Sequence, residues 1–98
     1  MCTMIAMHAD INGCGKGNQG WFPVTGAVVG FDHPTASAAE HALLLDFVNH
    51  DMGPSARVAV EMDLASGRAL IAQLQAAIEA AEMSGVREYA PGQEPAAA

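Results

Sequence analysis

The alternation of apolar and polar positions is clearest in residues 57–64, RVAVEMDL. Every second residue of this segment is apolar, and the residues between them are mostly polar or charged. Successive side chains of a strand point to opposite faces, so a period of two predicts a β-strand with one buried face. The predicted buried side is formed by Val58, Val60, Met62 and Leu64.

Three earlier segments are also predicted to be strands. Residues 2–9 alternate loosely and end at a Gly-rich stretch, which is interpreted as a flexible loop. Residues 21–33 form a longer apolar run, and residues 41–49 form another before the turn sequence HDMGPSA. These segments precede residues 57–64, so the chain is expected to form four strands.

A helix of about twenty residues is predicted after the fourth strand. Either Asp63 or Ser66 supplies a side-chain oxygen for its N-terminal cap, and Gly85 ends it. Its apolar stripe consists of Leu70, Ile71, Leu74, Ala77, Ile78 and Ala81. The order ββββα predicts an α+β fold, a four-stranded antiparallel sheet with one long C-terminal helix packed on one face. Residues 1–85 are expected to form this single domain, and residues 86–98 a mobile tail without a site.

The second and third strands are predicted to pair as a hairpin that aligns their apolar residues. In this register Phe31 lies opposite Leu43, Val29 opposite Leu45, Ala27 opposite Phe47, and His33 opposite His41. For the third and fourth strands, the predicted register aligns Val58 with Val48, Val60 with Asp46, and Met62 with Leu44. The helix is then expected on the Val60 side, and a second subunit on the opposite side, against Phe31, Val29, Leu43, Leu45 and Phe47.

The pairing of His33 with His41 suggests a metal site. Two imidazoles with a carboxylate nearby can begin the coordination of a divalent ion such as zinc or iron. Glu40 and Asp32 are close in sequence, and Cys2 is a third ligand if the chain start lies beside this hairpin end. The alternative is that the histidines are polar residues ending two strands.

Lys16 and Asp46 are two further candidates for ligand binding. The stretch NGCGKGNQGW lacks the hydroxyl residue after Gly15-Lys16 that a phosphate-binding loop needs, so no nucleotide is expected. Lys16 remains a possible contact for another anion, against the alternative of a plain solvated loop. Asp46 is flanked by apolar residues, where an unpaired carboxylate is costly, so a bonded partner is favoured over a catalytic role.

Composition limits the class of protein. Hydrophobic residues make up 51% of the 98 residues and charged residues 15%, which favours a folded chain that self-associates. A net charge of −7 argues against binding of nucleic acid or an anionic membrane. The first ten residues lack the parts of a secretory signal, and no run is long enough to span a bilayer. A cytoplasmic location is expected, with Cys2 and Cys14 as thiols.

Several short motifs resemble a family of small uncharacterised bacterial proteins found mainly in actinomycetes. They are MCT at 1–3, GKG at 15–17, WF at 21–22, FDHP at 31–34, AEH at 39–41 and DF at 46–47. The resemblance covers about residues 1–80 and implies a shared fold but no activity, because the family is a domain of unknown function. Its matching polar positions are Cys2, Lys16, His33, Glu40, His41 and Asp46.

Three functions remain open from the sequence, of which the last is a cofactor-free binder of a small apolar ligand between sheet and helix, without polar residues that would define its specificity. The first is a small homo-oligomeric metal-binding protein, which is catalytic if the metal keeps an open coordination position. The second is a non-catalytic accessory module whose apolar sheet face binds another copy or a larger enzyme. Whether the protein is an enzyme is not decided by these residues.

Overall fold

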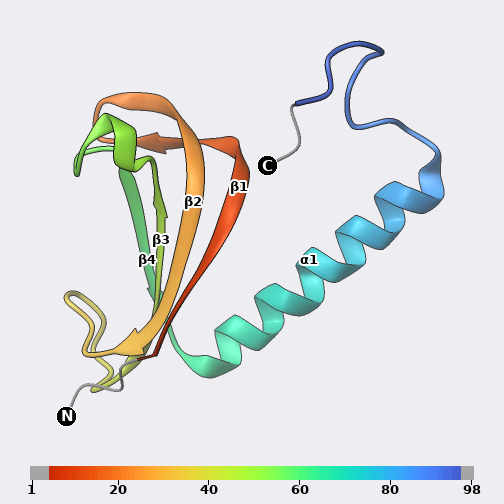
Figure 1. Cartoon of the computed structure of the whole chain (residues 1–98). Helices are drawn as coiled ribbons and strands as arrows, with labels where there is room; N and C mark the ends of the chain where they lie inside the picture. Colours follow the sequence, from red (N-terminus) through yellow and green to blue (C-terminus); the bar gives the residue numbers. More distant parts are fainter. Residues whose placement is uncertain (1–4, 96–98) are drawn as a thin grey trace. The chain divides into compact units, whose positions relative to one another are not determined.

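The computed structural model describes residues 5–95 and contains one antiparallel sheet followed by one long helix (Figure 1). The strands are neighbours in chain order, β1-β2-β3-β4. The predicted α+β composition, with four antiparallel strands and a C-terminal helix, is confirmed. The elements are β1 (Ile5–Gly17), β2 (Gly20–Asp32), β3 (Ala42–Val48), a 3-10 turn η1 (His50–Met52), β4 (Arg57–Met62) and α1 (Leu64–Ser84).

The chain divides into two compact units, residues 1–64 and residues 65–98. In the second unit, α1 ends where predicted, because Gly85 has a φ of 74°, the left-handed conformation that terminates helices. Asp63 directly precedes the helix, in the N-cap position, whereas Ser66 lies within the first turn. The packing of α1 on a face of the sheet stays a prediction, as does the single domain over residues 1–85.

The Gly-rich stretch is a strand and not the predicted flexible loop. β1 continues to Gly17, and only Asn18 and Gln19 connect it to β2. A Cβ atom added to Gly15 would lie 3.0 Å from Cγ2 of Val24 and 3.4 Å from Cγ2 of Val58. The close approach of β1 to apolar side chains therefore favours glycine here, a cause that composition alone does not distinguish from a turn.

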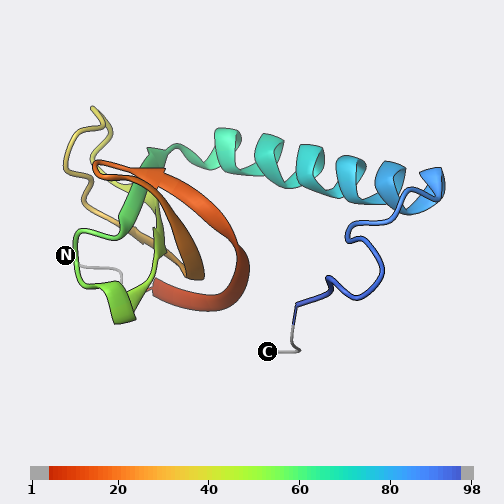
Figure 2. The ribbon, with the colours of Figure 1, turned by 90° about the horizontal axis from the view of Figure 1, so that it is seen from above.

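The hairpin of β1 and β2 carries an irregularity at which it curves (Figure 2). Asp10 pairs with Gly26 and Gly13 with Val24, so two residues of β1 oppose one of β2. Such a β-bulge increases local twist and bends the strand. Beyond it lies the core cluster of the sheet unit, in which Phe22, Val24 and Ala56 are buried and Ile11, Phe47 and Val58 pack against them.

The predicted register of β2 and β3 is confirmed, with Phe31 opposite Leu43 and Val29 opposite Leu45. The predicted register of β3 and β4 is wrong by one residue, because Val60 pairs with Leu45 and not with Asp46. The backbone bond from Asn49 N to Ala56 O at 3.2 Å closes the connection and sets this pairing.

The correction changes which side chains share a face, since a shift of one residue turns a strand over. Val58, Val60 and Met62 of β4 now lie on the same side as Leu43, Leu45 and Phe47 of β3, and not on the opposite side as predicted. We call this side the apolar face. It is formed by Ile5, Met7, Ala9, Ala27, Val29, Phe31, Leu43, Leu45, Phe47, Val58, Val60 and Met62.

Gly30 and Gly26 provide a matched test of the sheet's packing. A Cβ atom at Gly30 would lie 2.8 Å from the backbone oxygen of Ile5, which moves only if β1 and β2 separate. At Gly26 it would lie 2.7 Å from Nε2 of His8, the far end of a side chain that can rotate away. We expect Gly30→Ala to lower the free energy of unfolding by about 1–3 kcal/mol, and Gly26→Ala by clearly less. Urea unfolding measures both, and equal midpoints would contradict the pairing of Ile5 with Phe31.

Candidate functional site

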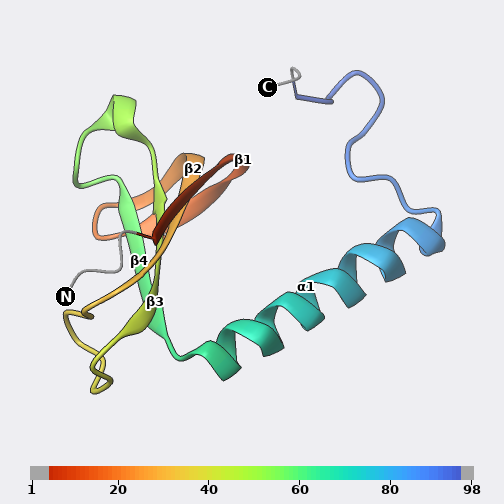
Figure 3. The same cartoon turned by 60° about the horizontal axis from the view of Figure 1, so that its bottom comes forward.

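The two histidines predicted to face each other lie side by side at one end of the sheet. His33 follows the end of β2, and His41 directly precedes β3. Their ring centroids are 4.4 Å apart and the ring planes are tilted by 47°. The connection that joins them and the connection that contains η1 lie at opposite ends of the sheet (Figures 1 and 3). The β2–β3 register therefore brings the imidazoles together, as the sequence predicts.

Each imidazole has a further contact that restricts its orientation. Oδ1 of Asp32 accepts from the backbone N of His33 at 2.8 Å and lies 2.9 Å from its Nδ1. A carboxylate oxygen only accepts, so in neutral His33 the proton is on Nδ1 and the lone pair is on Nε2. The ring of His41 stacks on Phe31 with centroids 5.9 Å apart. A histidine held by a carboxylate through one nitrogen has the arrangement of many metal ligands.

The other predicted metal ligands are not gathered around this pair. Glu40 is exposed, and no group of three or more His, Cys, Asp or Glu residues able to hold a metal occurs within residues 5–95. Cys2 lies outside the described residues. β1 nevertheless begins at this end of the sheet, because Ile5 pairs with Phe31.

Glu61 holds the connection between the two histidines, a role that the sequence analysis did not predict. Its carboxylate accepts three backbone N–H groups, from Thr35 at 2.6 Å, Ser37 at 2.8 Å and Ala36 at 2.9 Å. These bonds, led by the one from Thr35, hold the pKa of Glu61 below its usual value. The partners are separated by 24 to 26 positions in the chain, so no local motif signals this contact.

Asp46 has the bonded partner that the sequence analysis favoured. Nε and Nη2 of Arg57 each lie 2.7 Å from Oδ1 of Asp46. The corrected register pairs Asp46 with Val28 and Ala59, on the opposite side from the apolar face. The expected location of Asp46 among the apolar side chains of β4 is therefore wrong. The ion pair borders a hollow of about 290 Å³ whose lining also includes Val28, Val48 and Ala56.

Lys16 lies on β1 opposite Trp21, and not on a loop. It borders a hollow of about 330 Å³ whose other lining is mainly apolar, with Val24, Phe47 and Val58 among the residues. Cys14, an exposed free thiol, lines the same hollow. An anion contact by Lys16 stays a prediction.

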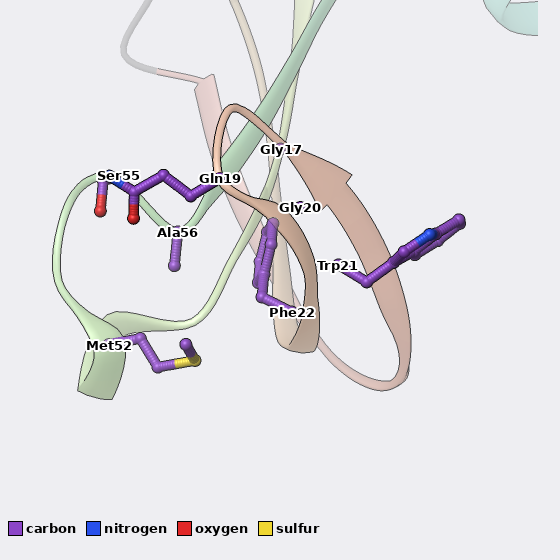
Figure 4. A pocket seen from close by; sticks show the side chains of 8 residues that line it. All are labelled: Gly17, Gln19, Gly20, Trp21, Phe22, Met52, Ser55 and Ala56. Carbon is purple, nitrogen blue, oxygen red and sulfur yellow. The ribbon is translucent and has the colours of Figure 1, made fainter.

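A smaller pocket of about 150 Å³ lies where the β1–β2 turn meets the connection before β4 (Figure 4). The side chains of Gln19 and Ser55 approach one side of it, while the indole of Trp21 points away. Its lining contains no ionisable side chain, so it offers neither an acid nor a base for catalysis. The chemically distinctive site of the described residues is therefore the His33–His41 end.

Comparison with protein families gives a match over residues 1–87 to DUF6295, a family of unknown function. The chain belongs to this family. Comparison with curated proteins and with solved structures gave no match. Family membership assigns no activity, so the interpretation of the site rests on its geometry. None of the helices within residues 5–95 has the length and hydrophobicity that crossing a bilayer requires.

We expect Glu61→Ala to release the connection between the two histidines. Loss of a charged acceptor exposes the amides of Thr35, Ala36 and Ser37 to solvent, so their hydrogen exchange should accelerate by about tenfold or more. Glu40→Ala, in the same connection, is the control and should leave these amides unchanged. Equal exchange in Glu61→Ala and the parent protein would show that the carboxylate does not hold this segment.

The same contact predicts a direction of pH dependence. Because the folded-state pKa of Glu61 is lowered from 4.5, its stabilising contribution is complete above that value. The contribution is lost as the pH falls through the lower pKa of the folded state. Exchange of the three amides, corrected for the intrinsic pH effect, should therefore accelerate in acid in the parent protein and not in Glu61→Ala.

Proposed function

We propose that this protein is a small, self-associating cytoplasmic protein that binds a divalent metal ion, zinc or iron, through His33 and His41. The observation that carries the proposal is the 4.4 Å separation of the two rings, combined with the bond from Asp32 to Nδ1 of His33. This arrangement leaves Nε2 of His33 to donate its lone pair to a metal.

The type of ligand fits the proposed metals. Neutral imidazole nitrogen is a common ligand of both zinc and iron. Glu40 and Cys2 remain the candidates from the same chain for further coordination. A metal that retains an open position would polarise a substrate or activate water, which is the route by which this site would become catalytic.

We expect His33→Ala and His41→Ala each to abolish metal binding while the protein stays folded. His50→Ala is the matched control, because His50 is exposed in η1, at the opposite end of the sheet. Elemental analysis of protein purified without an affinity tag or chelator measures bound metal directly. Metal retained in both His33→Ala and His41→Ala would exclude the pair as ligands.

The apolar face favours a second candidate, a non-catalytic accessory module that binds another copy or a larger enzyme. Several of its side chains are substantially exposed, among them Met7 at 69%, Ile5 at 48% and Val60 at 38%. Contiguous exposed apolar surface of this kind commonly marks a protein interface. The exposed residues come from both edge strands, β1 and β4.

Under this second candidate, Leu45→Glu should dissociate the protein, because it places a charge at the centre of the apolar face. Light scattering after size exclusion measures the mass, and circular dichroism checks that the variant is folded. The mass of the parent protein should not respond to chelators. A folded Leu45→Glu variant with unchanged mass would contradict an interface on this face.

A further inference from the structure

The His33–His41 pair lies at the end of the apolar face, and not apart from it. His41 stacks on Phe31, which belongs to that face through its pairing with Leu43. β2 and β3 are the two central strands of the sheet, so the imidazoles lie near its midline. A second protein covering the apolar face would therefore approach both rings.

The described part of the chain supplies only two ligands at this place. Residues 5–95 bring no third His, Cys, Asp or Glu into a metal-binding group with the pair. Oδ1 of Asp32 already contacts two nitrogens of His33, the backbone N and Nδ1. Structural zinc sites need four protein ligands and catalytic ones three, so a metal at this pair needs ligands beyond the two imidazoles.

The size of the apolar face also argues for an additional bond between copies. Part of the face is already covered within the sheet unit, because Phe47 and Val58 pack against the buried cluster, which leaves Ile5, Met7 and Val60 as its exposed large residues. Stable interfaces bury about 800 Å² per partner. A face-to-face contact of two such sheets is therefore modest by itself, and metal coordination across it would strengthen association.

We infer that two copies of this chain pack with their apolar faces together and share one metal ion between their His33–His41 pairs. This inference rests on the proposed metal-binding function. A two-fold axis running along the strands, between the two sheets, places both His ends at the same end of the dimer. The metal then has four imidazole ligands, two from each copy, and metal binding is coupled to dimerisation.

The spacing of packed sheets is compatible with this arrangement. Two sheets packed face to face lie about 10 Å apart, and side chains stand roughly perpendicular to each sheet. Imidazoles from opposing sheets therefore meet near the middle of the gap, where a zinc ion at about 2.0–2.1 Å from each nitrogen would bridge them. The four nitrogens satisfy a closed tetrahedral site, which is structural and not catalytic.

The test is a titration of the full chain with Zn²⁺, followed by sedimentation velocity and elemental analysis at each step. We expect one zinc ion per two chains, and a dimer dissociation constant lowered by about tenfold or more when zinc is present. His33→Ala should lose both zinc and the zinc-dependent part of dimerisation. By reciprocity, the parent protein should bind zinc more weakly at concentrations at which it is monomeric.

Two surface variants test the face without disturbing the buried cluster. Met7→Glu changes a residue of the apolar face that is 69% exposed, and Met83→Glu is the control, since Met83 is on α1 and 89% exposed. We expect Met7→Glu to weaken both dimerisation and zinc binding, and Met83→Glu to change neither. Zinc affinity that is equal in the two variants would overturn the inference.

The stoichiometry separates the inference from the function on which it rests. One zinc ion per chain in a monomer, lost in Cys2→Ser, would identify Cys2 as a ligand, overturn the shared site and leave metal binding by the histidines standing. Neither zinc nor iron bound by the parent protein would overturn both. If the parent protein is a monomer and Met7→Glu unfolds it, another part of the same chain covers the apolar face. This result would also overturn the inference.

Discussion

The pairing of β3 with β4 determines which surface of this protein is apolar. With Val60 opposite Leu45, the apolar residues of β4 lie on the same side of the sheet as Leu43, Leu45 and Phe47 of β3. The opposite side carries the ion pair of Asp46 with Arg57 and the carboxylate of Glu61. A shift of one residue would turn β4 over. Arg57 would then be separated from Asp46, and Glu61 from the backbone amides that donate to its carboxylate. The connection between the histidines thus depends on a register set at the other end of the sheet.

The difference between the two predicted registers has a physical explanation. The predicted alignment of β2 with β3 is correct, with Phe31 opposite Leu43. Phe31 lies between Gly30 and Asp32, so the apolar side of β2 is clear at this end of the strand. In β3, residues 43–45 are three consecutive leucines, so its period of two is weak and both alignments with β4 bury apolar side chains. The turn between β3 and β4 selects the register. There Oδ1 of Asn49 accepts from the backbone N of Asp51, and Nδ2 of Asn49 donates to the backbone oxygen of Pro23. This conformation is not encoded in the hydrophobic pattern.

The Gly-rich stretch is a strand and not the predicted loop for a related reason. Glycine is frequent both in turns and where two backbones or a backbone and a side chain approach closely, and the sequence does not separate these causes. Gly15 and Gly17 face Val24 and Phe22, where added Cβ atoms would come within 3.0 Å and 3.2 Å. The His33–His41 pair was predictable because it follows from one local hairpin. The role of Glu61 was not, since it requires both the register of β4 and the path of the connection above it.

The location of the histidines links the chemistry of the site to the stability of the sheet. The buried apolar residues of the sheet unit are few and include three alanines, Ala27, Ala42 and Ala56. Ile5, Met7 and Val60 of the apolar face are exposed, so a cover on this face would add to the stability of the sheet. That cover would also remove water from the side of Phe31 on which His41 stacks. Polar groups at the border of a covered face must be bonded, because burying them unpaired is costly. Asp32 provides such a bond for His33. Under the proposed function a metal ion would provide it for the remaining nitrogens, and covering the face would then favour metal binding at its end.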